Sequence, residues 1–268
     1  MSTLLVMSGG GAKAVQNHTG ALLALRDYGV KYDVVSGTSG GGLVALCAAT
    51  CMPPDVMRDV VAGLGNSDVQ DRRWFWRLRT AMKATSSIHR PDTVRRTIAR
   101  ILPRSRTALK MPCHVWGVDA ESWDYVDLCA PELGMDLHQA ALATMSAPGF
   151  LPAMPHNGRY YLDGGLRYNV PLADDWYEHF TSVWVLVASG RGDNKPGYDL
   201  LTNSIRALNI LMWDQTDDVL RSWPLRMAQA SKTAHVIHYP QSDVGIFDFQ
   251  PGAIEAGYAA VRDYMEGL

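Results

Sequence analysis

Two glycine-rich stretches near the start of the chain, residues 8–14 and 37–42, constrain its fold more than any other feature. Each follows a short apolar run, at residues 4–7 and 32–36, and each is followed by residues with helical patterning. Glycine loses more conformational entropy than other residues in a regular backbone, so clustered glycines mark tight turns or close approaches. The repeated order of strand, glycine loop and helix predicts a parallel sheet with crossover helices.

The rest of the chain continues this pattern with one interruption. Apolar periodicity predicts further strands at residues 114–119, 123–128, 159–162 and 183–187, and helices at residues 16–28, 43–51, 137–145 and 254–265. Residues 55–110 are helical in pattern, lack clear strands and are rich in arginine. We therefore expect an α/β protein with one domain over residues 1–268 and an inserted helical region at residues 55–110.

Composition excludes several classes of protein. A hydrophobic content of 47% with 19% charged residues is typical of a globular chain, and a net charge of -2 argues against a protein that coats nucleic acid. The four cysteines lie in mostly apolar contexts without C-x-x-C spacing, which favours free thiols over a metal site or a disulfide. No segment reaches the ~20 apolar residues of a membrane span. The apolar run at the start is too short for a signal peptide, so we expect a cytoplasmic protein.

The second glycine stretch carries the strongest signal for chemistry. Gly37-Thr38-Ser39-Gly40-Gly41 fits G-x-S-x-G between a predicted strand and a predicted helix. A nucleophilic serine must stand on a sharp turn so that its oxygen projects from the sheet edge, and the flanking glycines let neighbouring chains approach that turn. The amino end of the following helix adds positive potential there. We predict Ser39 as a nucleophile, with a purely structural turn as the alternative.

A nucleophilic serine needs a base, and two kinds are available. In an α/β-hydrolase the serine would follow the fifth strand and a histidine would come last, whereas Ser39 follows the second predicted strand. The eight histidines are scattered, and each is better explained as a surface or packing residue. Asp163 ends a strand-like segment and precedes Gly164-Gly165, so its carboxylate can approach another loop. An ordinary Asp-Gly turn explains Asp163 equally well.

The first glycine stretch has two interpretations. Gly9-x-Gly11-x-x-Ala14 satisfies the dinucleotide-binding pattern G-x-G-x-x-G/A, which expects an acidic residue about 20 positions later. Asp33 has that spacing but precedes the apolar part of its strand, at the other edge of the sheet. The second interpretation is an oxyanion hole built from backbone N–H groups. Because both glycine stretches leave the predicted sheet at the same carboxyl edge, the oxyanion hole is favoured.

Together these residues resemble the patatin-like phospholipases, lipid acyl hydrolases with a Ser-Asp dyad. Residues 9–13 resemble the loop G-G-G-x-K/R-G, with Ala14 in place of its last glycine, residues 37–41 match the elbow G-T-S-x-G, and Asp163-Gly164-Gly165 matches D-G-G/A. Residues 146–152 resemble S-x-A-x-P-x-x-F-P-P with altered spacing and one proline fewer, and residues 166–171 resemble the N-x-P tail. The motifs occur in the order that the family has.

The resemblance implies a three-layer α/β/α patatin-like fold and a lipid acyl hydrolase of the phospholipase A or lysophospholipase type. It implies that Ser39 attacks an ester carbonyl and that Asp163 accepts the serine proton directly. The oxyanion would be held by Gly9, Gly10 and Gly11. Lys13 would add positive charge, with an exposed lysine at a helix start as the alternative. No cofactor and no metal are expected; the other functions left open are a catalytically weak lipid-binding protein of the same fold and a dinucleotide-binding oxidoreductase.

Basic residues are concentrated between residues 72 and 110 and bear on the substrate. The set comprises Arg72, Arg73, Arg77, Arg79, Lys83, Arg90, Arg95, Arg96, Arg100, Arg104, Arg106 and Lys110, interleaved at its start with Trp74, Phe75, Trp76 and Leu78. Basic and aromatic residues together suit the interface of an anionic bilayer. A solvated helical cap over buried aromatics explains them equally. We expect a phospholipid or other lipid ester as substrate, peripheral membrane contact through this region, and no nucleic acid.

Overall fold

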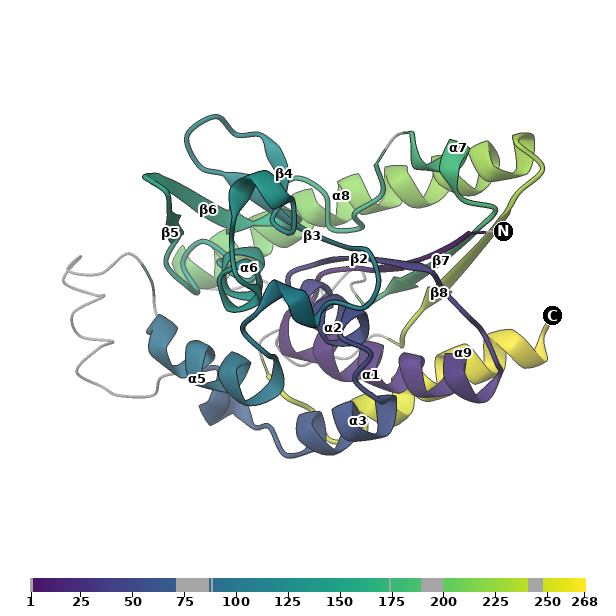
Figure 1. Ribbon diagram of the computed structural model, residues 1–268, viewed down its shortest axis with the longest axis horizontal. Helices are drawn as coiled ribbons and strands as arrows, with labels where there is room; N and C mark the ends of the chain where they lie inside the picture. The colour runs from purple at the N-terminus through teal and green to yellow at the C-terminus, as the bar shows by residue number, and fades with distance from the viewer. Residues whose placement is uncertain (1, 71–86, 88, 174, 189–199, 241–247) are drawn as a thin grey trace.

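The computed structural model of the chain has a central sheet between two layers of helices (Figure 1). It describes residues 2–70, 87, 89–173, 175–188, 200–240 and 248–268, and of residues 177, 200–209 and 211 it describes the backbone alone. The aromatic and basic residues predicted to contact a membrane at positions 72–83 lie outside the described residues.

The sheet is mixed and mostly parallel. Its strands are β1 (Thr3–Met7), β2 (Val34–Thr38), β3 (Cys113–Asp119), β4 (Tyr125–Asp127), β5 (Met154–His156), β6 (Arg159–Asp163), β7 (Ser182–Val187) and β8 (Thr233–His238). They lie in the order β5-β6-β3-β2-β1-β7-β8, with β4 also paired to β3. Strands β3, β2, β1, β7 and β8 run parallel, whereas β4, β5 and β6 make antiparallel pairs. The expected three-layer α/β/α arrangement with a mostly parallel sheet is confirmed.

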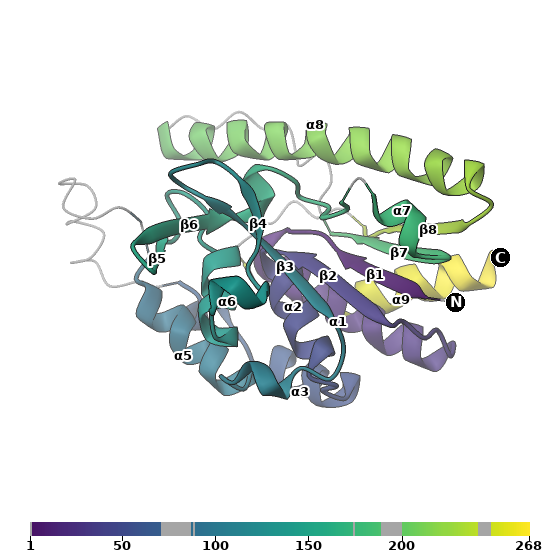
Figure 2. The same ribbon diagram turned by 45° about the horizontal axis from the view of Figure 1, so that its top comes forward.

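Helices cover both faces of this sheet. They are α1 (Gly11–Asp27), α2 (Gly40–Ala49), α3 (Pro54–Ala62), α5 (Pro91–Ile101), α6 (Leu137–Thr144), α7 (Trp176–His179), α8 (Leu200–Gln229) and α9 (Ala253–Glu266). Figure 2 shows α8 along one face, while α1, α2, α3, α5 and α9 lie on the other. The side chains of β1 alternate between the two layers: Leu5 and Met7 belong to the core under α1 and α2, and Leu4 and Val6 contact the core under α8.

Most predicted elements are confirmed, with ends shifted by a few residues. Helix α1 begins at Gly11 and α2 at Gly40, so part of each glycine stretch supplies the first turn of a helix. Helices α3 and α5 confirm the helical character of the arginine-rich region within its described residues. Helix α8 and strand β8 were not predicted. Helix α8 is only weakly amphipathic, and it contains Pro224, a residue that is typical of a helix break.

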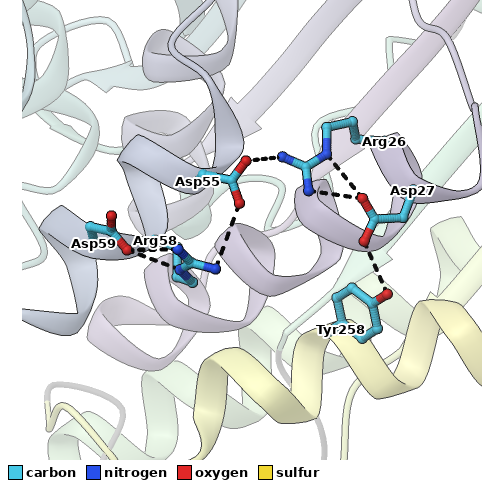
Figure 3. A network of polar contacts seen from close by, with 6 residues as sticks. All are labelled: Arg26, Asp27, Asp55, Arg58, Asp59 and Tyr258. Carbon is cyan, nitrogen blue, oxygen red and sulfur yellow. Dashed lines mark hydrogen bonds and ion pairs between the residues drawn. The ribbon is translucent and has the colours of Figure 1, made fainter.

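The end of helix α1 is tied to α3 and α9 by a network of charged groups (Figure 3). Arg26 of α1 forms ion pairs with its neighbour Asp27 and with Asp55 of α3, and the Tyr258 hydroxyl of α9 donates to Asp27 at 3.0 Å. The charged groups are exposed, so each pair contributes about 0–1 kcal/mol. Burial of Met57 and Val61 of α3 supplies the larger stabilisation.

Helices α1 and α9 pack backbone against backbone. A Cβ atom at Gly257 of α9 would overlap the carbonyl oxygen of Asn17, and one at Gly20 of α1 would overlap that of Ile254. Backbone carbonyls in adjacent helices cannot move aside separately, because each belongs to a helical hydrogen-bond ladder. Glycine at both positions therefore sets the separation of the two helices.

Gly257→Ala tests this close approach. Helix propensity alone favours alanine by about 1 kcal/mol, whereas overpacking destabilises by about 1–3 kcal/mol. We expect net destabilisation by Gly257→Ala in urea unfolding. Gly63→Ala is the control, because a Cβ there meets only ordinary contacts at 3.5 Å and beyond and its φ is -81°; it should be neutral or slightly stabilising. A stabilised Gly257→Ala variant would contradict the proposed role of the glycine.

Candidate active site

Ser39 stands on a strained turn between β2 and α2. Its backbone angles are φ 56° and ψ -126°, a region that residues with a Cβ rarely adopt. The backbone on both sides of the turn is closely packed. A Cβ at Gly37 would overlap the Gly41 carbonyl oxygen, and one at Gly41 would overlap the carbonyl oxygens of Met7 and Ser8. The local geometry expected for a projecting serine is therefore present at the carboxyl edge of the sheet.

Thr144, at the end of α6, fixes the turn from the side. Its hydroxyl donates to the Trp116 carbonyl of β3 at 2.7 Å and accepts the Ser39 backbone N–H at 2.9 Å. Sequence reasoning did not identify Thr144. The available signal was a hydroxyl residue at the end of the apolar helix 137–145, directly before the segment that resembles the family's proline-containing motif.

Asp163 lies at the end of β6, next to Ser39. It is 5% exposed, and its carboxylate accepts the Gly165 backbone N–H at 2.8 Å. Burial raises the pKa of Asp163 to about 7, although the Gly165 N–H and the nearby Ser39 hydroxyl favour the charged form. Its own backbone N–H donates to the Ser146 carbonyl at 3.1 Å. Two side chains that are far apart in the sequence are thus brought close together.

The first glycine stretch lies against the Ser39 turn. A Cβ at Gly40 would overlap the Gly11 carbonyl oxygen, and Gly10, with φ 149°, precedes the first turn of α1. The Gly9 N–H donates to the Asn169 carbonyl at 3.0 Å. The expectation that all three glycines hold an oxyanion therefore changes for Gly9, whose N–H is occupied. The N–H groups of Gly10 and Gly11 lie at the amino end of α1, where the helix dipole favours negative charge.

A buried polar chain supports this loop from behind. Ser8 Oγ accepts the Ala188 N–H at 2.8 Å, and the Ser8 carbonyl lies 2.9 Å from His18 Nε2. Since a carbonyl only accepts, Nε2 donates, and Nδ1 accepts the Tyr239 hydroxyl at 2.9 Å. Burial lowers the pKa of His18 to about 4, so the ring is neutral near pH 7. The sequence interpretation of His18 as a packing residue missed this supporting role.

Two further residues near this loop, Lys13 and Ala14, are buried. Lys13 is 9% exposed, and burial lowers its pKa, so the alternative of an exposed lysine at a helix start is wrong. Ala14, which replaces the family's last glycine, is fully buried, and its methyl lies 3.2 Å from the position that a Cβ at Gly10 would take. The Ala14 methyl fills space behind the loop and leaves the Gly10 and Gly11 N–H groups in place.

An apolar cavity begins beside Ser39. Its volume is about 50 Å³, and its wall is almost entirely carbon. Among the described residues, those around it are Gly11, Ala12, Val15, Ser39, Gly40, Leu43, Leu64, Val69, Val94, Thr97, Ile98, Met145, Phe150, Leu151 and Phe249. They come from α1, α2 and α5, from the Ser39 turn, and from the segments that follow α3, follow α6 and precede α9. An apolar group attached to an atom bound at Ser39 can enter this space.

Other sequence candidates lie elsewhere. Asp33 accepts the Thr3 N–H at 2.8 Å at the amino end of β1, away from the glycine stretches, which counts against a dinucleotide site. Within the described residues, no group of three His, Cys, Asp or Glu side chains is arranged to hold a metal ion. In the same part of the chain no helix has the length and apolar character needed to cross a membrane.

Several basic residues of the 72–110 region have internal partners. Arg100 pairs with Asp68 at 3.0 Å, and Arg104 pairs with Asp136 at 2.7 Å. Arg106 donates to the backbone carbonyls of the segment 129–135. These contacts fit the interpretation of a helical cap for the described part of the region.

Known proteins resemble this chain in sequence and in fold. A family model described as patatin-like phospholipase matches residues 5–176. Lysophospholipase NTE1 of Meyerozyma guilliermondii is 26% identical over 180 residues, 63% of this chain and 11% of its own length. Triacylglycerol lipase ptl2 of Schizosaccharomyces pombe is 30% identical over 210 residues, 68% of this chain and 32% of its own length. The chain thus spans a third or less of these curated relatives.

Among solved structures, VipD from Legionella pneumophila matches 99% of this chain and 67% of its own, with a TM-score of 0.56. The sequences are 13% identical, so this likeness concerns the fold.

Thr144→Val tests the side support of the Ser39 turn. Valine keeps the shape of threonine but leaves the Ser39 N–H without its acceptor and the Trp116 carbonyl without its donor. An unsatisfied buried group costs about 1–3 kcal/mol, so we expect destabilisation of at least that size in urea unfolding. Thr144→Ser keeps the hydroxyl and should retain most of the stability; equal losses in the two variants would contradict the hydrogen-bonding role.

Asp163→Asn tests the burial of the carboxyl group through pH. The pKa of Asp163 is about 7 in the fold against an ordinary value of 3.8, so the native state binds more protons between these values. The contribution of Asp163 to the free energy of unfolding is complete when the pH is below its pKa in the unfolded chain. That contribution is lost as pH rises toward 7, by up to about 1.4 kcal/mol per pH unit. Asparagine does not titrate. The stability of Asp163→Asn relative to wild type should therefore increase from pH 4 to pH 8.

The control for this titration is Asp124→Asn, because Asp124 is exposed in the β3–β4 turn. Removing this exposed carboxylate should change the unfolding free energy by no more than about 0.5 kcal/mol. A gap between Asp163→Asn and wild type that is constant with pH would show that Asp163 titrates normally.

Proposed function

Because the chain belongs to the patatin-like phospholipase family, whose model matches residues 5–176, we propose that it is a lipid acyl hydrolase that cleaves carboxylic esters of phospholipids or related lipids. Ser39 is the nucleophile and Asp163 is its base. The observation that carries the proposal is a serine on a strained turn at the sheet edge, with its hydroxyl beside the buried carboxylate of Asp163.

The proposed reaction runs through an acyl-enzyme. Asp163 takes the hydroxyl proton as Ser39 Oγ attacks the ester carbonyl, and the carbonyl oxygen becomes an oxyanion. The N–H groups of Gly10 and Gly11, with the amino end of α1, stabilise this charge. The tetrahedral intermediate expels the alcohol, which takes the proton from Asp163. Water then attacks the acyl group, gives its proton to Asp163, and the acid leaves as Ser39 recovers its proton.

The environment of Asp163 suits the role of base. A carboxylate with an ordinary pKa near 3.9 is a weak acceptor for a hydroxyl proton. Burial raises the pKa of Asp163 to about 7, which brings the base close to the pH at which a general base is most effective. The reaction needs no histidine between the two side chains, because the Ser39 hydroxyl lies beside the carboxylate.

The surroundings of Ser39 support a lipid substrate. The apolar cavity beside it offers an acyl chain contacts with Leu43, Ile98 and Met145 and few competing polar groups. Lys13 adds positive charge at the start of α1, where it favours the oxyanion. The same cavity also favours a second candidate, a lipid-binding protein of this fold with little catalysis, since an apolar site retains an acyl chain with or without chemistry.

Hydrolysis of defined phospholipids and p-nitrophenyl esters by Ser39→Ala tests the reaction. We expect a loss of at least about a thousandfold in kcat, because the attacking atom is removed. A fluorophosphonate probe should label the wild type and not Ser39→Ala. The control is Ser122→Ala, an exposed serine in the β3–β4 turn, which should keep both activity and labelling. Undiminished hydrolysis by Ser39→Ala would refute the assignment, and binding of lipids by an inert wild type would favour the second candidate.

The pH dependence of kcat/KM tests Asp163. The base must be deprotonated, so kcat/KM should fall as pH decreases through about 7, the pKa of Asp163 in the fold. Asp163→Asn should lose activity at all pH values, whereas Asp124→Asn should keep the wild-type profile. A wild-type profile that is flat between pH 5 and pH 8 would exclude Asp163 as the titrating base.

A further inference from the structure

A second, larger cavity, which is open to solvent, lies next to the apolar cavity beside Ser39. The second cavity has a volume of about 620 Å³, against about 50 Å³ for the first, and its wall is half polar. Two residues line both cavities, Leu64 and Phe249. Leu64 follows α3 and Phe249 precedes α9, so two segments distant in the sequence meet at the boundary.

The order of residues along α1 gives the direction of the first cavity. Gly11 and Ala12 line it where they adjoin the Ser39 turn, and Val15 lines it one helical turn later. The next residue, Gln16, lines the second cavity. With a rise of 1.5 Å per residue, Gln16 lies about 7.5 Å along the helix from Gly11. Ser39 is therefore at one end of the apolar cavity, and Leu64 and Phe249 are at the other.

Hydrogen bonds hold the Phe249 segment in place on both sides. The Phe249 N–H donates to Asn66 Oδ1 at 2.8 Å, and Asn66 Nδ2 donates to Asp248 Oδ1 at 2.8 Å. On the other side Gln16 and Gln250 form a reciprocal pair: the Gln250 N–H donates to Gln16 Oε1 at 2.8 Å, and Gln16 Nε2 donates to the Gln250 carbonyl at 2.9 Å. Hydrogen bonds to the backbone of Phe249 and Gln250 thus fix the position of Phe249 between the two cavities.

We infer that Leu64 and Phe249 form a wall that limits the length of the acyl chain accepted beside Ser39. The inference rests on the proposed function, because it identifies the site's substrates as esters of short and medium-length acyl groups. A longer chain must displace one of the two side chains to reach the second cavity. Removing either side chain joins the cavities and gives the chain a continuous path.

The test measures kcat/KM for p-nitrophenyl esters from butyrate to palmitate. Leu64→Ala and Phe249→Ala should raise the ratio of palmitate to hexanoate hydrolysis by at least about tenfold relative to wild type, since each additional buried methylene changes kcat/KM severalfold. Ile98→Ala is the matched control for Leu64→Ala: it removes the same number of carbon atoms from the same cavity, but Ile98 does not line the second cavity. In Ile98→Ala, the acyl-chain length that gives the highest kcat/KM should increase only by the few carbon atoms that fit into the vacated space.

Rates are normalised to the fraction of each preparation that reacts with the fluorophosphonate probe, so that a partly unfolded variant does not mimic a change in specificity. Phe249→Leu provides a milder variant, which should give an intermediate profile. Unchanged profiles in Leu64→Ala and Phe249→Ala would overturn the inference, as would an equal lengthening in Ile98→Ala.

A second measurement separates this inference from the proposed reaction. Binding of free fatty acids from octanoate to palmitate is measured by calorimetry in the Ser39→Ala background, where no hydrolysis occurs. With the wall intact, the affinity for fatty acids should stop increasing at a medium chain length. With Leu64→Ala, the affinity should continue to increase with chain length up to palmitate. If esters are not hydrolysed by the wild type but this difference in binding is found, the reaction is wrong and the wall stands. Equal length dependence with and without Leu64 would overturn the wall.

Discussion

The close approach of the two glycine stretches is the constraint on which the rest of the structure depends. Strands β1 and β2 are neighbours in a parallel sheet, so the loops that follow them emerge at one edge, roughly 4.8 Å apart. At that spacing the first turns of α1 and α2 meet backbone to backbone, and Cβ atoms at Gly40 and Gly41 would overlap carbonyl oxygens of the first loop. The strained backbone of Ser39 persists because the surrounding chain leaves it no other conformation.

Segments from later in the chain hold this pair of loops in register. The end of α6 and the residues that follow it contact both proposed catalytic residues, since Thr144 accepts the Ser39 N–H and the Ser146 carbonyl accepts the Asp163 N–H. The segment after Asp163 binds back to the first loop through the Asn169 carbonyl and to β2 through the Pro171 carbonyl. The site is therefore built by the backbone and short side chains, which hold donors and acceptors in fixed positions.

Burial gives this site its chemical character and lowers its stability. The Asp163 carboxyl group pays a desolvation penalty above its pKa of about 7, and that same penalty makes it a better proton acceptor. Burial also favours the neutral form of His18, but here it lowers the pKa, to about 4. The neutral ring donates to the Ser8 carbonyl without adding charge behind the loop. Two buried titratable groups thus have distinct places, one beside Ser39 and one supporting the backbone.

The sequence by itself determined the strand–loop–helix units and selected Ser39 and Asp163 as candidates for the proposed dyad. These features depend on the conformations of a few consecutive residues, which glycine spacing and apolar periodicity encode locally. The tertiary structure decided what depends on distant neighbours. It shows the Gly9 N–H bonded to Asn169, Lys13 buried, and Thr144 bonded to a residue 105 positions away. Leu64 and Phe249 meet only when α3 and α9 pack beside α1, because a wall between two cavities exists only once the helices are assembled.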